Sequence, residues 1–209
     1  MKIKVCGMKN PQNINDLTAL NPDFIGFIFY EKSPRFCANK LKNLDFIPKN
    51  IKKVGVFVNE TAEKISETVQ QYDLDVIQLH GAETPEFCKS LKQKLQDVKI
   101  TKAINIENVL DVEKTKMYDS DCCDYFLFDT KTHLHGGSGI KFDWWTLNWY
   151  DGDIPFFLSG GISIDDAAKI KEIYHDLLHG IDINSKFEIE PGLKDIEKVK
   201  NFITQLKNE

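Results

Sequence analysis

Long apolar runs are missing from this 209-residue sequence, and none approaches the roughly 18 residues that a membrane-spanning helix requires. The N-terminus also lacks the basic segment and long apolar stretch of a secretory signal peptide, and strand-like residues begin at Ile3. We therefore expect no membrane association and a fold that starts with the first residues.

Positive charge is not in excess either. The chain has 27 Lys and Arg residues against 32 Asp and Glu residues, and its formal net charge is −5 at pH 7. The basic residues are dispersed, whereas nucleic-acid-binding domains usually gather them on one face. We therefore expect no nucleic-acid partner.

Cysteine is sparse and odd in number. The five cysteines form no C-x-x-C pair, which argues against a disulfide framework and against a zinc knuckle. Cys122 and Cys123 could join His133 and His135 around a metal ion, but the spacing is unconvincing and hard carboxylate partners are lacking. We expect no bound metal, and a reducing cytoplasm as the compartment.

What the chain does contain is an alternation of short apolar runs and longer amphipathic stretches. The apolar runs are rich in β-branched and aromatic residues and nearly continuous, as expected for parallel strands covered on both faces. They span residues 3–6, 24–29, 53–58, 76–80, 99–104, 125–129, 155–159 and 179–183.

Several of the intervening stretches begin with helix start signals. Asn10 and Thr84 each precede a proline, residues 163–166 have a capping-box pattern, and Asp143 can cap a short helix. Eight strand–helix units without a linker predict an α/β protein, a single-domain (β/α)8 TIM barrel over residues 1–209. An open doubly wound sheet is the alternative, although the G-x-G-x-x-G fingerprint is absent after the first strand.

Functional residues of such barrels lie in the loops that follow the strands. Cys6 follows the first strand and is either a functional thiol or a small buried hydrophobe. Asp129 ends the sixth strand and is a helix cap, a salt-bridge partner or an acid–base group.

Glycines mark a second group of loops. Gly160 and Gly161 follow the seventh strand, ahead of the capped helix, and residues 182–185 follow the eighth. This pairing matches the phosphate site of many barrels, in which backbone N–H groups at a helix start bind the anion. The other interpretation of the two glycines is a tight turn.

Other side chains near the strand ends are less diagnostic. Arg35 follows a proline and either binds a carboxylate through two parallel N–H bonds or is a solvated loop charge. His80 ends the fourth strand and fits a hydrogen-bonded histidine at the edge of the core. The tryptophans at positions 144, 145 and 149 have helical spacing and fit core packing.

The motifs form an ordered set that covers essentially the whole chain. They read "KVCGMKN", "GFIFYEKSPR", "VGVFVN", "IQLHGAE", "LFDT", "GGSGIKFDW", "LSGGIS" and "GIDINSKFEIEPGLKD". In this order the sequence resembles the phosphoribosylanthranilate isomerase family of tryptophan biosynthesis. The resemblance implies a cofactor-free Amadori rearrangement of a phosphosugar–anthranilate, from N-(5-phosphoribosyl)anthranilate to 1-(2-carboxyphenylamino)-1-deoxyribulose 5-phosphate.

The resemblance also implies a role for individual residues. Cys6 matches the general base, which needs a lowered thiol pKa near neutrality, and Asp129 matches the general acid. Arg35 would bind the anthranilate carboxylate, and residues 130–141 would include a mobile loop over the substrate. The phosphate would lie against Gly160, Gly161, Asn184 and Ser185.

Lys186 departs from the family pattern, which commonly has glycine there, so the direction of its ammonium group stays open. Another phosphosugar barrel enzyme, of histidine or indole-glycerol-phosphate synthesis, is the nearest alternative, but it lacks Cys6 combined with the "KSPR" motif. A non-catalytic phosphometabolite-binding barrel and a thiol-redox or metal-binding protein are further alternatives. We expect a monomer or a homodimer.

Overall fold

The computed structural model describes residues 1–130 and 141–207. Eight parallel strands close into a barrel in chain order, and β8 pairs with β1. They are β1 (Lys2–Val5), β2 (Phe24–Ile28), β3 (Lys52–Phe57), β4 (Val76–Leu79), β5 (Lys99–Ile106), β6 (Tyr125–Thr130), β7 (Phe156–Leu158) and β8 (Leu178–Ile183). Every predicted strand is present within two residues of its predicted ends, so the closed barrel is confirmed and the open sheet is wrong.

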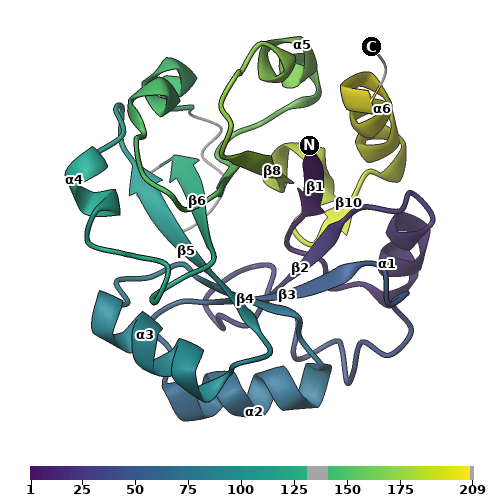
Figure 1. The fold of residues 1–209 in the computed structure, drawn as a ribbon. Helices are drawn as coiled ribbons and strands as arrows, with labels where there is room; N and C mark the ends of the chain where they lie inside the picture. The colour runs from purple at the N-terminus through teal and green to yellow at the C-terminus, as the bar shows by residue number, and fades with distance from the viewer. Residues whose placement is uncertain (131–140, 208–209) are drawn as a thin grey trace.

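Helices surround the barrel, as Figure 1 shows. They are α1 (Pro11–Thr18), α2 (Ala62–Tyr72), α3 (Pro85–Lys94), α4 (Val112–Thr115), α5 (Ala167–Lys171) and α6 (Ile196–Lys207), with the 3-10 helices η1 (Trp144–Trp149), η2 (Ile164–Asp166) and η3 (Ser185–Phe187). A short antiparallel pair, β9 (Glu188–Glu190) and β10 (Leu193–Lys194), follows η3. Within the described ranges, no helix has the length and apolar character needed to cross a bilayer.

The predicted helix starts are present. The side chains of Asn10 and Thr84 accept backbone N–H bonds at the beginnings of α1 and α3, and Asp143 does so for η1. The carboxylate of Asp166 accepts the N–H of Ser163, 2.6 Å away, which is the return bond of a capping box. These capping bonds therefore determine the residue at which each of these helices begins.

One of the eight units has no helix. Residues 29–51, between β2 and β3, form successive turns, visible in Figure 1 as loop between α1 and α2. Buried side chains still recur there every three or four positions, among them Leu41 and Leu44. Asn43 accepts the N–H of Asp45 with its side chain, a local bond that competes with helix, and Pro48 follows.

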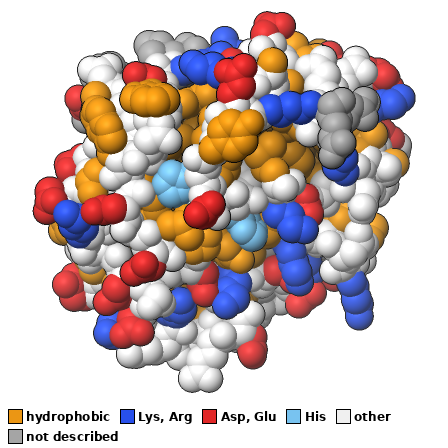
Figure 2. All heavy atoms as spheres, turned by 45° about the horizontal axis from the view of Figure 1, so that its top comes forward, with side chains coloured by type: hydrophobic (Ala, Val, Ile, Leu, Met, Phe, Trp, Pro, Cys, Tyr) orange, Lys and Arg blue, Asp and Glu red, His pale blue; other side chains and the backbone are white. Residues whose placement is uncertain are grey.

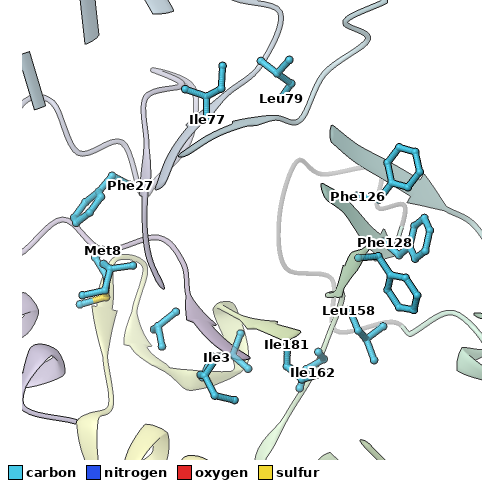
Figure 3. Close-up of a cluster of buried hydrophobic side chains, with 14 of the residues drawn as sticks. Ile3, Met8, Phe27, Ile77, Leu79, Phe126, Phe128, Leu158, Ile162 and Ile181 are labelled. Atoms are coloured by element: carbon cyan, nitrogen blue, oxygen red, sulfur yellow. The ribbon is translucent and has the colours of Figure 1, made fainter. Parts of the chain in front are cut away.

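The buried apolar side chains divide into two clusters because a closed sheet separates them. The larger cluster lies between the strands and the outer helices and loops, and Figure 3 shows its labelled side chains around the outside of the barrel. The smaller cluster fills the barrel interior and consists of Phe24, Val54, Val76, Ala103, Leu127 and Phe157. Alternating strand positions thus supply both layers.

The tryptophan prediction is wrong for two of three residues. Trp144 is buried, but Trp145 and Trp149 are 70% and 52% exposed. A 3-10 helix has three residues per turn, so Trp144, Leu147 and Tyr150 share the inward side of η1. On the face that Figure 2 shows, hydrophobic side chains reach the surface between charged groups of both signs.

Candidate active site

Cys6 continues β1 by one residue and its side chain is buried. The Cys6 N–H donates to Ile183 O of β8 at 2.9 Å, and the Gly7 N–H donates to Gly26 O of β2 at 2.9 Å. A Cβ added at Gly26 would lie 2.7 Å from Cys6 Sγ. The thiol therefore packs against the backbone of β2, and only a residue without a side chain leaves room for it there.

The surroundings of Cys6 shift the pKa of its thiol in both directions. Burial raises the pKa of Cys6, the cations Lys4 and Lys194 lower it, and the carboxylate of Asp182 raises it. Because burial dominates, the net direction is upward. The chain's own groups around Cys6 therefore do not supply the lowered thiol pKa that a general base needs.

Asp129 lies near the end of β6 and contacts His80. Asp129 Oδ2 is 3.2 Å from His80 Nε2, and both side chains are about a quarter exposed, at 23% and 24%. The amide nitrogen of Gln78 lies 2.9 Å from His80 Nδ1. If this amide donates, His80 carries its proton on Nε2 and donates it to Asp129. Sequence reasoning placed His80 at the core edge and missed this contact with the candidate acid.

Arg35 is the single arginine of the chain, among 27 basic residues. It is 7% exposed. Its guanidinium donates hydrogen bonds to both carboxylate oxygens of Glu188, from Nε to Oε1 at 2.9 Å and from Nη2 to Oε2 at 2.6 Å. An arginine in a chain that otherwise uses lysine points to a requirement for the planar, two-pronged donor. The solvated-charge interpretation of Arg35 does not fit this burial.

Lys194, on β10, joins the same cluster. Its fully buried ammonium group lies 2.7 Å from Glu188 Oε1 and 2.8 Å from Asn184 Oδ1. Burial lowers the pKa of Lys194 to about 8, against the raising effect of Glu188. Because Lys194 and Arg35 face a single carboxylate, the three groups carry one uncompensated positive charge at neutral pH, which suits an anionic ligand.

Gly7 allows these groups to converge. Its φ is +83°, and a Cβ there would lie 2.7 Å from Asn184 Oδ1 and 2.8 Å from Arg35 Cδ. The loops after β1, β2 and β8 therefore meet at this glycine. At the end of β1, Cys6 thus supplies a buried thiol, and Gly7 leaves room for the side chains of Arg35 and Asn184.

The glycine turn after β7 has the expected conformation. Gly160 and Gly161 have φ values of +94° and +67°, and a side chain on Gly160 would overlap Thr130. The capped helix that follows is only the 3-10 turn η2 and the five-residue α5. An anion at this turn would therefore be held by individual N–H groups more than by a long helix dipole.

The end of β8 supplies the second part of this region. Ser185 begins η3 directly after Asn184, and both are half-buried. Lys186 is exposed, and it is not among the residues with positive φ. The turn therefore does not need the glycine that the family commonly has there.

The structure brings most of the predicted residues together at the carboxyl ends of the strands. Asp129 is close enough to Asp182 to raise the pKa of that carboxyl, and Gly160 packs against Thr130 of β6. Residues 131–140, with His133, His135 and the predicted loop, lie outside the described residues. In the ranges that are described, no three His, Cys, Asp or Glu side chains are arranged to hold a metal ion.

Sequence reasoning missed four charged groups of the site, which are Lys4, Asp182, Glu188 and Lys194. Glu188 and Lys194 lie on the short pair β9 and β10, which is mostly not buried, whereas Lys4 and Asp182 are charged side chains inside strands that are largely buried. A charge inside such a run was the available signal, because buried charges need a partner. The single arginine was a second signal.

The fold and the site define a class, a (β/α)8 barrel with a buried thiol, a carboxylate–imidazole pair and a cation cluster where its strands end. The profile of the N-(5'-phosphoribosyl)anthranilate isomerase family matches residues 3–205, and the chain belongs to this family. It is 50% identical to the N-(5'-phosphoribosyl)anthranilate isomerase of Parabacteroides distasonis, over 99% of this chain and 93% of that one.

Solved structures agree with this assignment. The phosphoribosyl anthranilate isomerase of Thermotoga maritima has a TM-score of 0.84 and 31% identity, over 99% of this chain and 98% of that one. Another phosphoribosyl anthranilate isomerase, with a TM-score of 0.76 and 28% identity over the same shares, was solved with reduced 1-(o-carboxyphenylamino)-1-deoxyribulose 5-phosphate.

Proposed function

We propose that the chain catalyses the Amadori rearrangement of N-(5'-phosphoribosyl)anthranilate to 1-(2-carboxyphenylamino)-1-deoxyribulose 5-phosphate, a step of tryptophan biosynthesis. One observation carries the proposal. In a member of this family, a buried thiol, an acid and a net-positive arginine cluster occupy the same end of the barrel. The enzyme acts without a cofactor.

Asp129 acts first, as the general acid. It gives a proton to the furanose ring oxygen, the C1–O bond breaks, and the ring opens to a protonated Schiff base. His80 orients the Asp129 carboxyl through the contact at Oδ2. The partial exposure of Asp129 leaves it within reach of a bound sugar.

Cys6 acts second, as the general base. The iminium acidifies the C2 proton, which the thiolate removes to give the enolamine, and tautomerisation yields the ketone. Burial raises the pKa of the Cys6 thiol, and the positive iminium next to it opposes that effect, so the thiol releases its proton to solvent and the thiolate then takes the proton from C2. The substrate thereby activates its own base.

The two anionic ends of the substrate hold it in place. The carboxylate lies on Arg35, whose donors are only partly used by Glu188, and the net charge of the cluster favours it. The phosphate lies against backbone N–H groups of Gly160, Gly161, Asn184 and Ser185. We place the enzyme in the cytoplasm, as a monomer or homodimer.

A turnover assay tests the function. Anthranilate and phosphoribosyl pyrophosphate are converted to the labile substrate in situ by a separate transferase, and purified protein is then added. We expect an enzyme-dependent loss of anthranilate-type fluorescence and a product with the mass of the aminodeoxyribulose phosphate. Absence of turnover by folded protein would refute the function and leave the non-catalytic phosphometabolite-binding alternative.

Replacement of Arg35 tests the carboxylate site. In Arg35→Lys the charge is kept but the two-pronged donor is lost, so we expect KM to rise about tenfold or more, the scale of a lost charge-assisted hydrogen bond. The kcat should change less, because the carboxylate is charged in both ground and transition states. Steady-state kinetics of Lys9→Ala are the control, since Lys9 Nζ donates to Pro34 O, in the loop that carries Arg35. An unchanged KM in Arg35→Lys would contradict the assignment.

Two substitutions test the phosphate site. Gly161→Val puts a β-branched residue at a φ of +67°, so we expect loss of competitive inhibition by inorganic phosphate. Lys186→Ala should leave this inhibition unchanged because Lys186 lies on an exposed turn. Inhibition constants are measured for both variants after circular dichroism confirms folding. The reverse pattern, with loss in Lys186→Ala alone, would move the phosphate to the ammonium group.

A further inference from the structure

The barrel interior contains a buried ion pair that the reaction scheme above does not use. Lys4 Nζ of β1 lies 2.8 Å from Asp182 Oδ2 of β8, and the two side chains are 3% and 4% exposed. Lys4 and Asp182 are directly paired in the register of the two strands. The second carboxylate oxygen, Asp182 Oδ1, is buried without a hydrogen-bond partner in the described part of the chain.

Such a pair is poorly explained by stability. Burial of two charges costs solvation free energy, and well-packed apolar residues of similar size often stabilise a core as well or better. The neighbours of Lys4 inside the barrel include Phe24, Val76 and Phe157, which supply the apolar packing. The Lys4–Asp182 ion pair in this layer therefore needs an explanation other than packing.

The geometry of β1 gives Lys4 a second contact. Lys4 and Cys6 are two residues apart, so both side chains point to the same side of the strand. The Lys4 ammonium group donates to Asp182 and lies close enough to Cys6 to favour the charged form of the thiol. An ammonium group has three donors, so it can hold the carboxylate and the sulfur at once.

We propose that Lys4 is the positioning residue of Cys6, holding the sulfur in place and stabilising it as the thiolate, while Asp182 fixes the ammonium group. The proposal rests on the proposed function, in which Cys6 is the base. Asp182 has two opposing effects, since it orients Lys4 but also places a negative charge near the sulfur.

Charged and titratable groups near Cys6 come from several elements of the fold. Lys4 and Asp182 come from β1 and β8, Lys194 from β10, and Cys37 from the segment after β2. The Lys194 ammonium group donates to Glu188 and Asn184. Of the two cations, Lys4 lowers the pKa of the Cys6 thiol more than Lys194 does, and it shares the inward side of β1 with Cys6.

The pKa of the Cys6 thiol can be measured without turnover. The thiolate absorbs in the ultraviolet, and the difference between each protein and its Cys6→Ser counterpart isolates this thiol from the other four. We expect Lys4→Met to raise the Cys6 pKa by about one unit or more, the usual effect of an adjacent unit charge. Asp182→Asn should lower it, because removal of the negative charge beside the sulfur outweighs the looser hold on Lys4.

The opposite signs distinguish the proposal from a structural ion pair, whose loss would act alike in both variants. Lys53→Met is the matched control, since it removes a Lys–Asp pair, to Asp73 at 2.6 Å, that is remote from Cys6, and it should leave the thiol pKa unchanged. With substrate, the rise of kcat/KM with pH should move in Lys4→Met as the thiol pKa moves, with KM within about twofold.

Each outcome decides the question. Shifts in the same direction, or no shift, in Lys4→Met and Asp182→Asn would overturn the proposal. If Lys4→Met does not fold, Lys4→Gln, which keeps a polar end on the side chain, decides in its place, since an unchanged or lowered Cys6 pKa there contradicts the proposal. Wild-type protein that fails to turn over phosphoribosylanthranilate would refute the proposed function, and the thiol titration would still test the contact between Lys4 and Cys6.

Discussion

Asp129→Asn should lower kcat by about 10²-fold or more, the usual scale for loss of a positioned general acid. The amide keeps the shape of the carboxyl and can still accept the bond from His80 Nε2, so the fold and the contact at 3.2 Å should persist. What is lost is the proton for the ring oxygen. KM should change little, because the carboxylate and phosphate sites involve other residues.

Stopped assays with in situ substrate measure this loss, with circular dichroism as the test of folding. Asp111→Asn is the matched control because Asp111 caps α4 and asparagine is an equally good cap. His80→Asn is measured in parallel. Near-normal kcat in Asp129→Asn together with a large loss in His80→Asn would transfer the acid role from the carboxyl to the imidazole.

The fold was predictable because its signals are local. Each strand run is apolar enough to be buried on both faces, and side chains such as Asn10 and Thr84 cap helices within three residues of themselves. Prediction of secondary structure and burial was weaker in segments without a strong helix or strand propensity, where packing against the rest of the protein decides the conformation. Residues 29–51 cover the barrel without a helix, and Trp145 turns to solvent because η1 has three residues per turn.

The candidate site was predictable only in part because its pairings are not local. Cys6, Asp129 and Arg35 could be placed at strand ends from the order of the motifs. The partner of Arg35 is Glu188, 153 positions away, and that of Lys4 is Asp182, 178 positions away. No spacing rule links such positions, so only the closed barrel, which pairs β8 with β1, reveals them.

The electrostatic state of the thiol was the least predictable feature. The general-base role of Cys6 suggested a lowered thiol pKa, yet burial within the protein raises it. The sequence carries no record of how deeply a thiol lies or which ammonium group touches it. Those quantities depend on Gly26, which leaves space for the sulfur, and on Lys4, which lies two residues before Cys6 on the same side of β1.

Cys6→Ser should also lower kcat by about 10²-fold or more. Serine is nearly isosteric and fits against Gly26, but its hydroxyl is a far weaker acid than a thiol, so almost no alkoxide is available even beside Lys4 and the substrate iminium. The substrate should still bind, since the Arg35 cluster and the glycine turn are intact, and KM should stay within about threefold.

The cost of a buried hydroxyl must be separated from the loss of the base. Cys88→Ser is the matched control, because Cys88 is equally buried but lies on α3, outside the barrel. Both variants should lose some thermal stability, while kcat should fall in Cys6→Ser alone. A folded Cys6→Ser protein with near-normal kcat would show that another group removes the C2 proton. Equal losses of kcat in the two variants would trace the defect to the fold, since Cys88 has no part in the proposed chemistry.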